Sequence, residues 1–396
     1  MLMYGLITES ILIKSSMTFA IDMRPSQEGM GGIAEYTSMV ARTCAELAPE
    51  HTFVLFFSGL KVTLPSWVLD YKNVITYIHR VPNKITNTAL YLYQRPALDS
   101  LIKKSIPTPI DVWLLPNLHF ISLSRSQKSV MTVHDVSFQR YPEFYSAKQR
   151  WWHGAVKPRM LLSQSQHLLA VSQYTKDDMV KEFGIPESKI TVTPLGINAA
   201  YTQNISSTGK EVQTPGRSIV ASTAHDPRKN IAAIVQGYCI LRKNNPYMSD
   251  VSLHLVGRKG KWVDQLRFVP SAFRSSIHVY HNLSYAALAD LTRRASVFVY
   301  PSFYEGFGLP LLEAMAAGIP VISSPNSAIL ETAGDSAYYT DPYNPYAMSR
   351  ALDVLLSDAS LRVALSEKGK QRAAGYTWHT TAEKTLAALE RIAATQ

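Results

Sequence analysis

The sequence has only two cysteines, Cys44 and Cys239, among its 396 residues. Two thiols so far apart exclude a disulfide framework and a cysteine-based zinc module, and they suit a reducing cytoplasm. No apolar run reaches the roughly 18 residues that a membrane-spanning helix needs, so we expect no transmembrane segment. Residues 1–16 lack the basic start of a signal peptide, and we expect them to be an appendage to a fold that begins at Met17.

The charge is positive overall but evenly spread. The 40 Lys and Arg residues outnumber the 30 Asp and Glu residues by ten, and each half of the chain, divided at residue 200, contributes half of that excess. A positive charge attracts anionic partners, and nucleotide-sugar diphosphates, anionic lipid surfaces and nucleic acid are all candidates on this ground. A basic tail that would bind nucleic acid is missing, and we identify no recognition module, so we expect no nucleic-acid partner.

Short apolar runs alternate with longer segments of helical periodicity along the chain. This rhythm predicts βαβ units and parallel sheets that are buried on both faces. In the first half the runs, rich in Val, Ile and Phe, lie at 18–22, 52–57, 111–115, 130–136, 167–172 and 189–194. In the second half they lie at 218–223, 251–257, 277–283, 295–302 and 320–324.

A polar stretch rich in Ser, Thr and Gly, residues 201–217, separates the two series of runs. It predicts a linker between a first domain at 17–200 and a second domain at 218–375. Both domains are expected to be doubly wound, and ligands of such sheets bind beyond the carboxyl ends of the strands. We therefore expect the functional site in a cleft between the two domains.

The first segment that can carry chemistry follows the first predicted strand. Gly31 and Gly32 precede a run in which apolar residues recur every three or four positions, which predicts a helix. Glycine lets the backbone approach a ligand closely, and the free N–H groups of a helix start favour phosphate. A tight turn also needs glycine for conformational reasons alone, so both interpretations stay open. The spacing is not G-x-G-x-x-G, so it predicts no nicotinamide cofactor.

Two polar pairs follow other predicted strands. His134 and Asp135 lie at the end of the run at 130–136, where catalytic groups of such folds collect. Arg228 and Lys229 lie near a predicted helix start, where cations oppose the helix dipole unless an anion is bound there. A structural histidine and a solvated surface pair are the alternative interpretations.

The segment YPSFYEGFGLPLLEAMAAGIPVISS, residues 300–324, carries the strongest pattern. A buried strand leads into a loop with Glu305, and Glu313 follows eight positions later inside a predicted helix. Two carboxylates are good acceptors for the hydroxyls of a sugar. The glycines of the loop, Gly306 and Gly308, allow backbone N–H groups to face a ligand. These are the N–H groups of Phe307, Gly308 and Leu309.

The spacing in EGFGLPLLE resembles the E-x7-E motif of the retaining glycosyltransferases of family four, which have the two-domain GT-B fold. The resemblance extends from Met17 to the end of the chain and includes IDMRP, GGIAEYT, VHDVSF, PRKN and GDSAYYTDP. The chain is most similar to bacterial mannosyltransferases of polysaccharide and O-antigen assembly. The resemblance also implies that a C-terminal helix at 376–396 crosses back onto the first domain.

The resemblance implies a role for each matched position. Gly31, Gly32 and Lys229 would contact the donor diphosphate. Glu305 would hold the donor sugar, and Glu313 would hold the ribose hydroxyls. The implied catalytic residues are His134, which would lie beside the donor sugar on the acceptor side, Glu305 and Lys229. The implied donor-binding residues are Gly31, Gly32, Arg228, Lys229, Leu283, Glu305, Gly306, Phe307, Gly308, Leu309 and Glu313.

The sequence also departs from the family pattern. The Gly-Arg pair that many relatives have before the lysine aligns with residues 223–224, Thr-Ala, so that phosphate-binding arginine is missing. Arg228 or Arg258 is the expected substitute. The usual glycine near the base pocket aligns with His281, which leaves the identity of the base open. Asn198 replaces a common aspartate.

The implied reaction moves a hexose from a nucleoside diphosphate to an acceptor hydroxyl, with retention at the anomeric carbon. No D-x-D pair occurs in the sequence, so we expect neither a metal nor another cofactor. Cationic side chains and helix-start N–H groups would neutralise the leaving diphosphate instead. GDP-mannose is the expected donor, with UDP-glucose and dTDP-rhamnose as alternatives. A non-catalytic sugar-nucleotide-binding protein is the alternative from a different class.

The expected acceptor is a glycan or a polyprenyl-linked oligosaccharide of a bacterial surface polysaccharide. Residues 148–159 combine Trp151 and Trp152 with four cationic side chains. A basic, aromatic helix face can rest on an anionic membrane. This would place the protein in the cytoplasm, peripheral at the inner face of the plasma membrane. The alternative is that both tryptophans belong to the core and that the charges are simply solvated.

Overall fold

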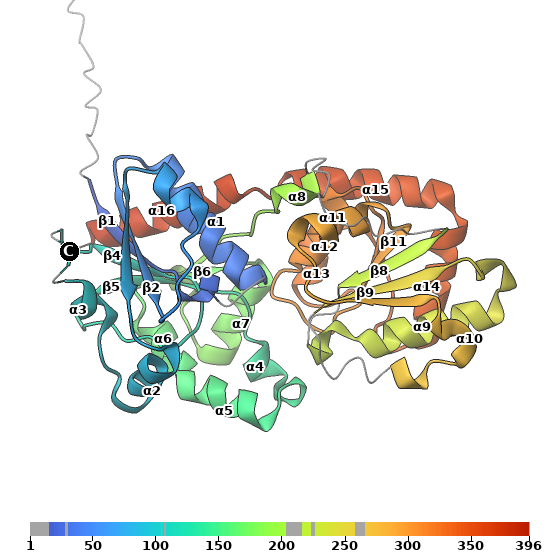
Figure 1. Cartoon of the computed structure of the whole chain (residues 1–396), viewed down its shortest axis with the longest axis horizontal. Coiled ribbons are helices and arrows are strands. Elements are labelled where there is room, and N and C mark those ends of the chain that lie inside the picture. The colour runs from blue at the N-terminus through green and yellow to red at the C-terminus, as the bar shows by residue number, and fades with distance from the viewer. Residues whose placement is uncertain are drawn as a thin grey trace, which may run out of the picture.

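The structure is a computed structural model. Over the part of the chain that it describes, two parallel sheets lie side by side, each with helices packed on it (Figure 1). The expectation of two doubly wound domains is therefore confirmed. The expected appendage (residues 1–15), most of the expected linker (203–215) and the aligned positions 223–224 and 258 lie outside the described residues. The described residues are 16–27, 31–103, 105–106, 108–202, 216–222, 226–257 and 266–395.

The first sheet is formed by β1 (Thr18–Asp22), β2 (Thr52–Ser58), β3 (Val74–His79), β4 (Val112–Leu115), β5 (Lys128–Val133), β6 (His167–Ala170) and β7 (Ile190–Val192). Its strand order is β3-β2-β1-β4-β5-β6-β7, and neighbouring strands run parallel. The order reverses at β1, which pairs with β2 on one side and with β4 on the other. Sheets of this kind bind ligands at such a switch point.

The first domain has helices on both faces of its sheet. Its helices are α1 (Gly32–Leu47), α2 (Asn83–Tyr93), α3 (Leu98–Ile102), α4 (Ser137–Arg140), α5 (Ala147–Val156), α6 (Pro158–Gln164), α7 (Gln173–Phe183) and α8 (Ala199–Thr202). Successive strand residues point to opposite faces. Phe19 and Ile21 of β1 therefore pack on the α1 side, whereas Ala20 packs on the side of α2, α3, α6 and α7. Burial on both faces explains why the strands read as continuous apolar runs.

The second sheet is formed by β8 (Ser218–Ser222), β9 (Ser252–Val256), β10 (Ile277–Tyr280), β11 (Val297–Tyr300), β12 (Val321–Ser323) and β13 (Ala337–Tyr339). Its order, β10-β9-β8-β11-β12-β13, reverses at β8 in the same way. Its helices are α9 (Ile231–Asn244), α10 (Ser271–Arg274), α11 (Tyr285–Arg293), α12 (Leu309–Ala316), α13 (Ala328–Ala333), α14 (Pro345–Ser357) and α15 (Ala359–Ala374).

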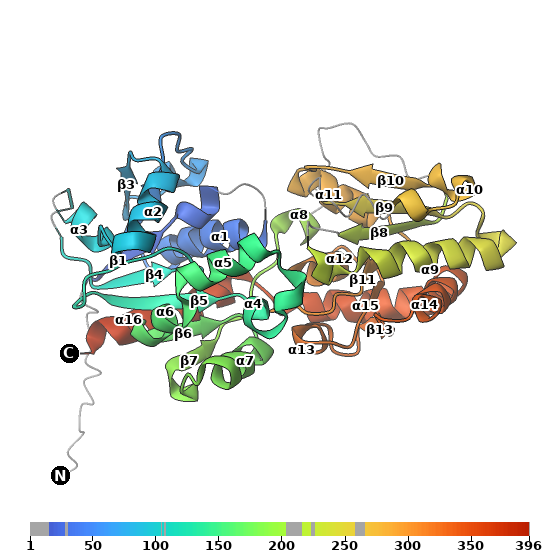
Figure 2. The ribbon, with the colours of Figure 1, turned by 90° about the horizontal axis from the view of Figure 1, so that it is seen from below.

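The last helix, α16 (Trp378–Ala394), lies along the first sheet although α14 and α15 belong to the second domain (Figures 1 and 2). It packs against α1, where Cys44 contacts the backbone of Ala382. The chain thus passes between the domains twice, once before α8, which packs against α11 and α12 of the second domain, and once before α16. The two passages touch, because a Cβ atom on Gly196 would lie 2.2 Å from the backbone nitrogen of Trp378.

Candidate active site

The two switch points face each other, and the predicted site residues gather between them. The segment after β5 brings His134 from the first domain. The loop after β11 brings Glu305 from the second domain. Lys229 comes from a short 3-10 turn after β8, Pro227–Lys229.

Lys229 and Glu305 form an ion pair in this cleft. The Lys229 Nζ donates to Glu305 Oε1 at 2.6 Å, and only 12% and 10% of the two side chains are exposed. Nζ also lies 4.8 Å from the centre of the Tyr300 ring, which adds a cation–π contact. The sequence predicted both residues to bind one donor, and the structure brings them together.

Arg228 connects the two domains. Its guanidinium donates to Asp226 in its own domain and to Asp135 in the first domain, with 3.2 Å between Nη1 and Asp135 Oδ2. Burial alone would raise the pKa of Asp135, but the charge of Arg228 and hydrogen bonds from Ser137 lower this pKa to about 2. Two carboxylates therefore already balance the Arg228 charge. Its expected role at the donor diphosphate stays a prediction.

His134 is held as a neutral side chain. Burial lowers its pKa to about 4, although the Pro116 carbonyl and the charge of Asp135 act to raise it. Its Nε2 lies 2.9 Å from the Pro116 carbonyl oxygen, which can only accept a hydrogen bond. Nε2 therefore carries the proton, and Nδ1 of the neutral ring is an acceptor. The ring packs edge-on against Tyr36 of α1.

Gly306 forms the tightest contact between the domains. A Cβ atom at this position would lie 1.7 Å from the His134 carbonyl oxygen, so only glycine fits. The Gly306 carbonyl in turn accepts hydrogen bonds from Ser172 Oγ at 2.6 Å and from Thr175 Oγ1 at 3.1 Å. The loop after β11, which was predicted to hold the donor sugar, thus also forms the seam, that is, the contact around Gly306 between the two domains.

A carboxylate reinforces this seam from the second domain. Glu331 of α13 accepts hydrogen bonds from the backbone N–H groups of Gln173 and Tyr174, at 2.8 and 3.0 Å. These groups begin α7 of the first domain, where a negative charge is favourable for the helix dipole. Sequence analysis missed this contact, because a glutamate on an ordinary helix gives no signal of a partner about 160 residues away.

The start of α12 presents backbone donors. Gly308 has φ of 94° and caps the helix in a left-handed conformation that favours glycine. Among the described residues, the N–H groups of Phe307, Gly308 and Leu309 have no hydrogen-bond acceptor. Such groups at a helix start suit an anionic or hydroxyl-bearing ligand, as the sequence predicted.

The remaining predicted residues lie around the same cleft. Gly31 caps α1, and a Cβ on Gly32 would meet no atom within 4 Å, so the backbone is open to a ligand there. Leu283 lies just before α11 and is partly buried. His281 donates through Nδ1 to the Gly257 carbonyl at 3.0 Å. Sequence analysis missed Glu35, a buried carboxyl on the first turn of α1.

Glu313 is buried in α12, with 6% of its surface exposed. Burial raises the pKa of this carboxyl well above its ordinary value, and the charge of Glu35 raises it further. The Tyr201 hydroxyl acts in the opposite direction. A buried carboxyl with a raised pKa beside a cleft is a frequent feature of functional sites.

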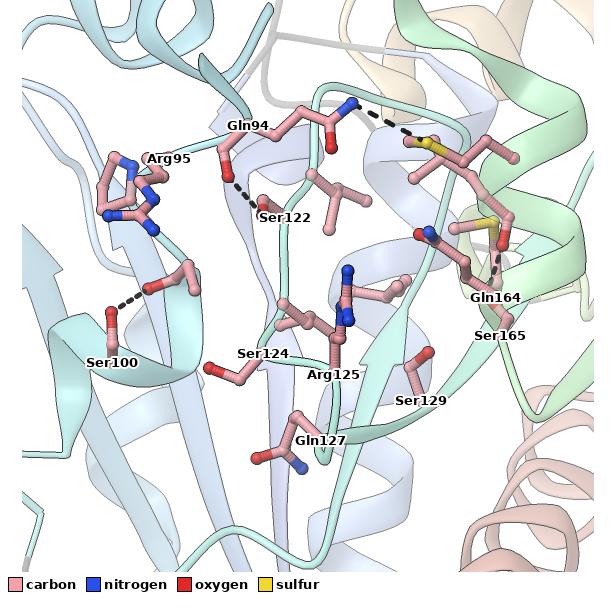
Figure 3. A pocket seen from close by; sticks show the side chains of 18 of the residues that line it. Gln94, Arg95, Ser100, Ser122, Ser124, Arg125, Gln127, Ser129, Gln164 and Ser165 are labelled. Atoms are coloured by element: carbon pink, nitrogen blue, oxygen red, sulfur yellow. Dashed lines mark hydrogen bonds between the residues drawn. The ribbon is translucent and has the colours of Figure 1, made fainter.

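A cavity of about 1230 Å³ lies elsewhere in the first domain, and none of the predicted site residues lines it (Figure 3). It forms where the connection between β4 and β5 contains no helix, so one face of these strands is less covered. Leu115 and Met131 are among the residues that line it, together with amide, hydroxyl and guanidinium groups of Gln94, Arg95, Ser122, Arg125 and Gln164. The region between the domains, where the predicted site residues gather, is therefore distinct from this cavity.

Neither a metal site nor a membrane-spanning helix is found among the described residues. In that part of the chain, no group of three or more His, Cys, Asp or Glu side chains is arranged to hold a metal ion. None of the helices described is long and apolar enough to cross a bilayer.

Comparison with solved structures identifies the fold. The chain superposes on WaaG, a glycosyltransferase involved in lipopolysaccharide biosynthesis, with a TM-score of 0.68 and 16% identity over 96% of this chain and 100% of that one. It superposes on sucrose-phosphate synthase from Thermosynechococcus elongatus with a TM-score of 0.73 and 16% identity over 95% and 99% of the two chains. The fold is that of the GT-B glycosyltransferases, as expected from the sequence.

Sequence comparisons identify the family. The model Glycosyltransferase Family 4 matches residues 30–201, and the model Glycosyl transferases group 1 matches residues 209–372. The O-antigen chain mannosyltransferase RfbU of Salmonella typhimurium is 30% identical over 69% of this chain and 75% of its own length. The O-antigen chain mannosyltransferase B of Escherichia coli is 29% identical over 68% and 71%. The chain belongs to glycosyltransferase family four, and it is a glycosyltransferase.

Proposed function

We propose that this protein transfers mannose from GDP-mannose to a hydroxyl of a glycan or lipid-linked oligosaccharide in bacterial surface polysaccharide synthesis. The observation that carries the proposal is the Lys229–Glu305 ion pair at the joint switch point, directly beside the Gly306–His134 seam. The similarity to O-antigen chain mannosyltransferases supports the choice of sugar. Retention of configuration and independence from metal are part of the proposal.

The ion pair gives the donor two complementary partners. A bound diphosphate would attract Lys229 away from Glu305, because it carries more negative charge than one carboxylate. Glu305 would then accept hydrogen bonds from hydroxyls of the donor sugar. Lys229 and the backbone N–H groups at the starts of α1 and α12 would stabilise the charge that develops on the leaving diphosphate. Pre-oriented groups of this kind contribute about 2.7–4 kcal/mol each to such reactions.

His134 would act on the sugar as a hydrogen-bond acceptor. The Nε2–H group of His134 donates its hydrogen bond to the Pro116 carbonyl, and the low pKa of His134 keeps the ring neutral at physiological pH. Nδ1 can therefore accept from a sugar hydroxyl but cannot supply a proton to the leaving group. This leaves the acceptor proton to a donor phosphate oxygen, on the same face of the sugar, which is consistent with retention.

Alanine substitutions test the site. We expect Lys229→Ala and Glu305→Ala each to lower donor turnover by at least about a hundredfold while the protein remains folded. Lys370 and Glu367 form a matched ion pair of 2.9 Å on the surface of α15, about half exposed. Lys370→Ala and Glu367→Ala should leave turnover unchanged. Near-normal turnover in both cleft variants would refute the site.

A thermal-shift screen with GDP, UDP, dTDP and their sugar conjugates tests the donor. A ligand at a hundred times its dissociation constant adds about 2.7 kcal/mol of stability. Stabilisation by GDP and GDP-mannose alone would support the proposal, whereas stabilisation by UDP-glucose or dTDP-rhamnose would replace the donor. Hydrolysis of the bound donor would distinguish an enzyme from a non-catalytic sugar-nucleotide-binding protein.

A membrane contact is proposed for one face of the first domain. Trp151 of α5 is 59% exposed, and Ile85, Leu92 and Tyr93 of α2 are also exposed. Trp152 instead packs beside Phe120, at 5.8 Å between ring centres, so it belongs partly to the core. Trp151 lies in a segment with four cations, Lys148, Arg150, Lys157 and Arg159, which suits the inner, anionic face of a plasma membrane.

A further inference from the structure

Two buried carboxyls from different domains meet beside the donor cleft. Glu35 on the first turn of α1 is 7% exposed, and Glu313 in α12 is 6% exposed. Within the described part of the chain, Oε2 of Glu35 and Oε1 of Glu313 have no hydrogen-bond partner. Buried polar atoms nearly always have a partner, so an unpaired oxygen on each of two neighbouring carboxyls requires an explanation.

The groups around the pair are neutral and hold the carboxyls in place. Asn198 Nδ2 donates to Glu35 Oε1 at 2.5 Å. The Tyr285 hydroxyl lies beside Glu35, and the Tyr201 hydroxyl lies beside Glu313. Each carboxyl is thus fixed through one side, and one oxygen remains for another donor. Asn198 occupies the position where relatives commonly have aspartate, and an amide can donate to Glu35 where a carboxylate would repel it.

Two buried carboxyls that interact with each other need protons or hydrogen-bond donors. Burial raises the pKa of both groups, and the charge of Glu35 adds to the effect on Glu313. A vicinal diol supplies two adjacent O–H donors and no charge. One diol can therefore satisfy both unpaired oxygens, whereas an anion would be repelled and a single hydroxyl would satisfy only one of them.

We infer that Glu35 is a second ribose-binding residue, and that the 2′- and 3′-hydroxyls of the donor nucleotide donate one to Glu313 and one to Glu35. The inference rests on the proposed nucleotide-sugar donor and extends it. The nucleoside is then held by a carboxyl from each domain, and Glu35 and Glu313 together determine specificity for a ribose with both hydroxyls. The neighbouring Gly31, whose backbone lies within reach of Tyr285, would place the diphosphate in continuity with this ribose.

Analogues that lack a single hydroxyl test the inference. Calorimetric titrations would compare GDP and UDP with their 2′-deoxy and 3′-deoxy analogues. Each missing hydroxyl removes one hydrogen bond to a charged group. We therefore expect the affinity of the wild type for each deoxy analogue to be about tenfold or more lower than for the ribonucleotide. The Glu35→Gln variant keeps the size of the side chain. In this variant the loss of affinity for one of the two deoxy analogues should fall to about twofold or less. The loss of affinity for the other analogue should remain as in the wild type. Glu35→Ala should give the same selective loss.

Matched controls separate this inference from the proposed function. Glu46 lies on the same helix but is exposed, so Glu46→Gln should keep both penalties. Wild-type protein that binds ribonucleotides, together with a Glu35→Gln variant that keeps both penalties, would overturn the role of Glu35 alone. Wild-type protein that binds neither GDP nor UDP would overturn the proposed function and this inference together.

Discussion

Substitution of Gly306 by alanine should separate the domains without unfolding either of them. The new Cβ would lie 1.7 Å from the His134 carbonyl oxygen, and ordinary contact begins near 3.4 Å, so the loop must withdraw by about 1.7 Å. That movement breaks the hydrogen bonds from Ser172 and Thr175, which contribute about 1 kcal/mol each. Crowding in a packed site adds about 1–3 kcal/mol to the free-energy cost of the closed arrangement. The closed arrangement then becomes less favourable by roughly 3–5 kcal/mol, and donor turnover should fall at least about a hundredfold.

Two measurements check this reasoning. Donor turnover gives kcat/KM, and small-angle X-ray scattering should give a larger radius of gyration for Gly306→Ala than for the wild type. Gly154 on α5 is the control, because a Cβ there would meet no atom within 4 Å. Gly154→Ala should change neither quantity. A Gly306→Ala variant with wild-type turnover, or one that loses turnover with an unchanged radius of gyration, would refute the steric argument.

Two other predictions concern His134 and Trp151. Because burial lowers the pKa of His134 to about 4 from an ordinary 6.5, the unfolded chain binds more protons than the folded one between these values. The free energy of unfolding should therefore fall as pH drops from 6.5 toward 4, and it should fall less in His134→Gln, measured by urea unfolding at several pH values; equal losses would contradict the burial argument. Trp151→Ala should weaken sedimentation with anionic liposomes, whereas Tyr247→Ala, which removes an aromatic side chain 87% exposed on the second domain, should not. Unchanged binding by the Trp151 variant would remove this face from the proposal.

The sequence allowed the central strands to be predicted better than the edges. β1, β2 and β8 are buried on both faces and give continuous apolar runs. Of the four edge strands, β3 and β13 are partly exposed and no such run marked them, whereas β7 and β10 were predicted by the runs at 189–194 and 277–283. The run at 130–136 also extended too far, because β5 ends at Val133, before the turn that carries His134 and Asp135.

Individual site residues were predictable, but their pairing was not. Lys229, Glu305 and Glu313 lie in motifs whose spacing and glycines indicate a ligand. That Lys229 binds Glu305 depends on two loops 76 residues apart, and local pattern carries no information about such a contact. Glu35 could have been noticed as a carboxyl one turn after Gly31 and beside an apolar helix face. Its burial depends on the other domain, however, and composition along α1 does not show that.

The contact between Gly196 and Trp378 determines how the two domains can move. A single covalent connection would let one domain swivel freely about the other. Because the two connections touch at one point, they act together as a single hinge, with the cleft on one side of it. Motion of one domain relative to the other is then restricted largely to rotation about one axis through this hinge. The contacts of the Gly306 seam lie away from that axis and separate when the cleft opens. Product release would therefore require the whole seam to part at once, so its rate would depend on the summed strength of the seam contacts.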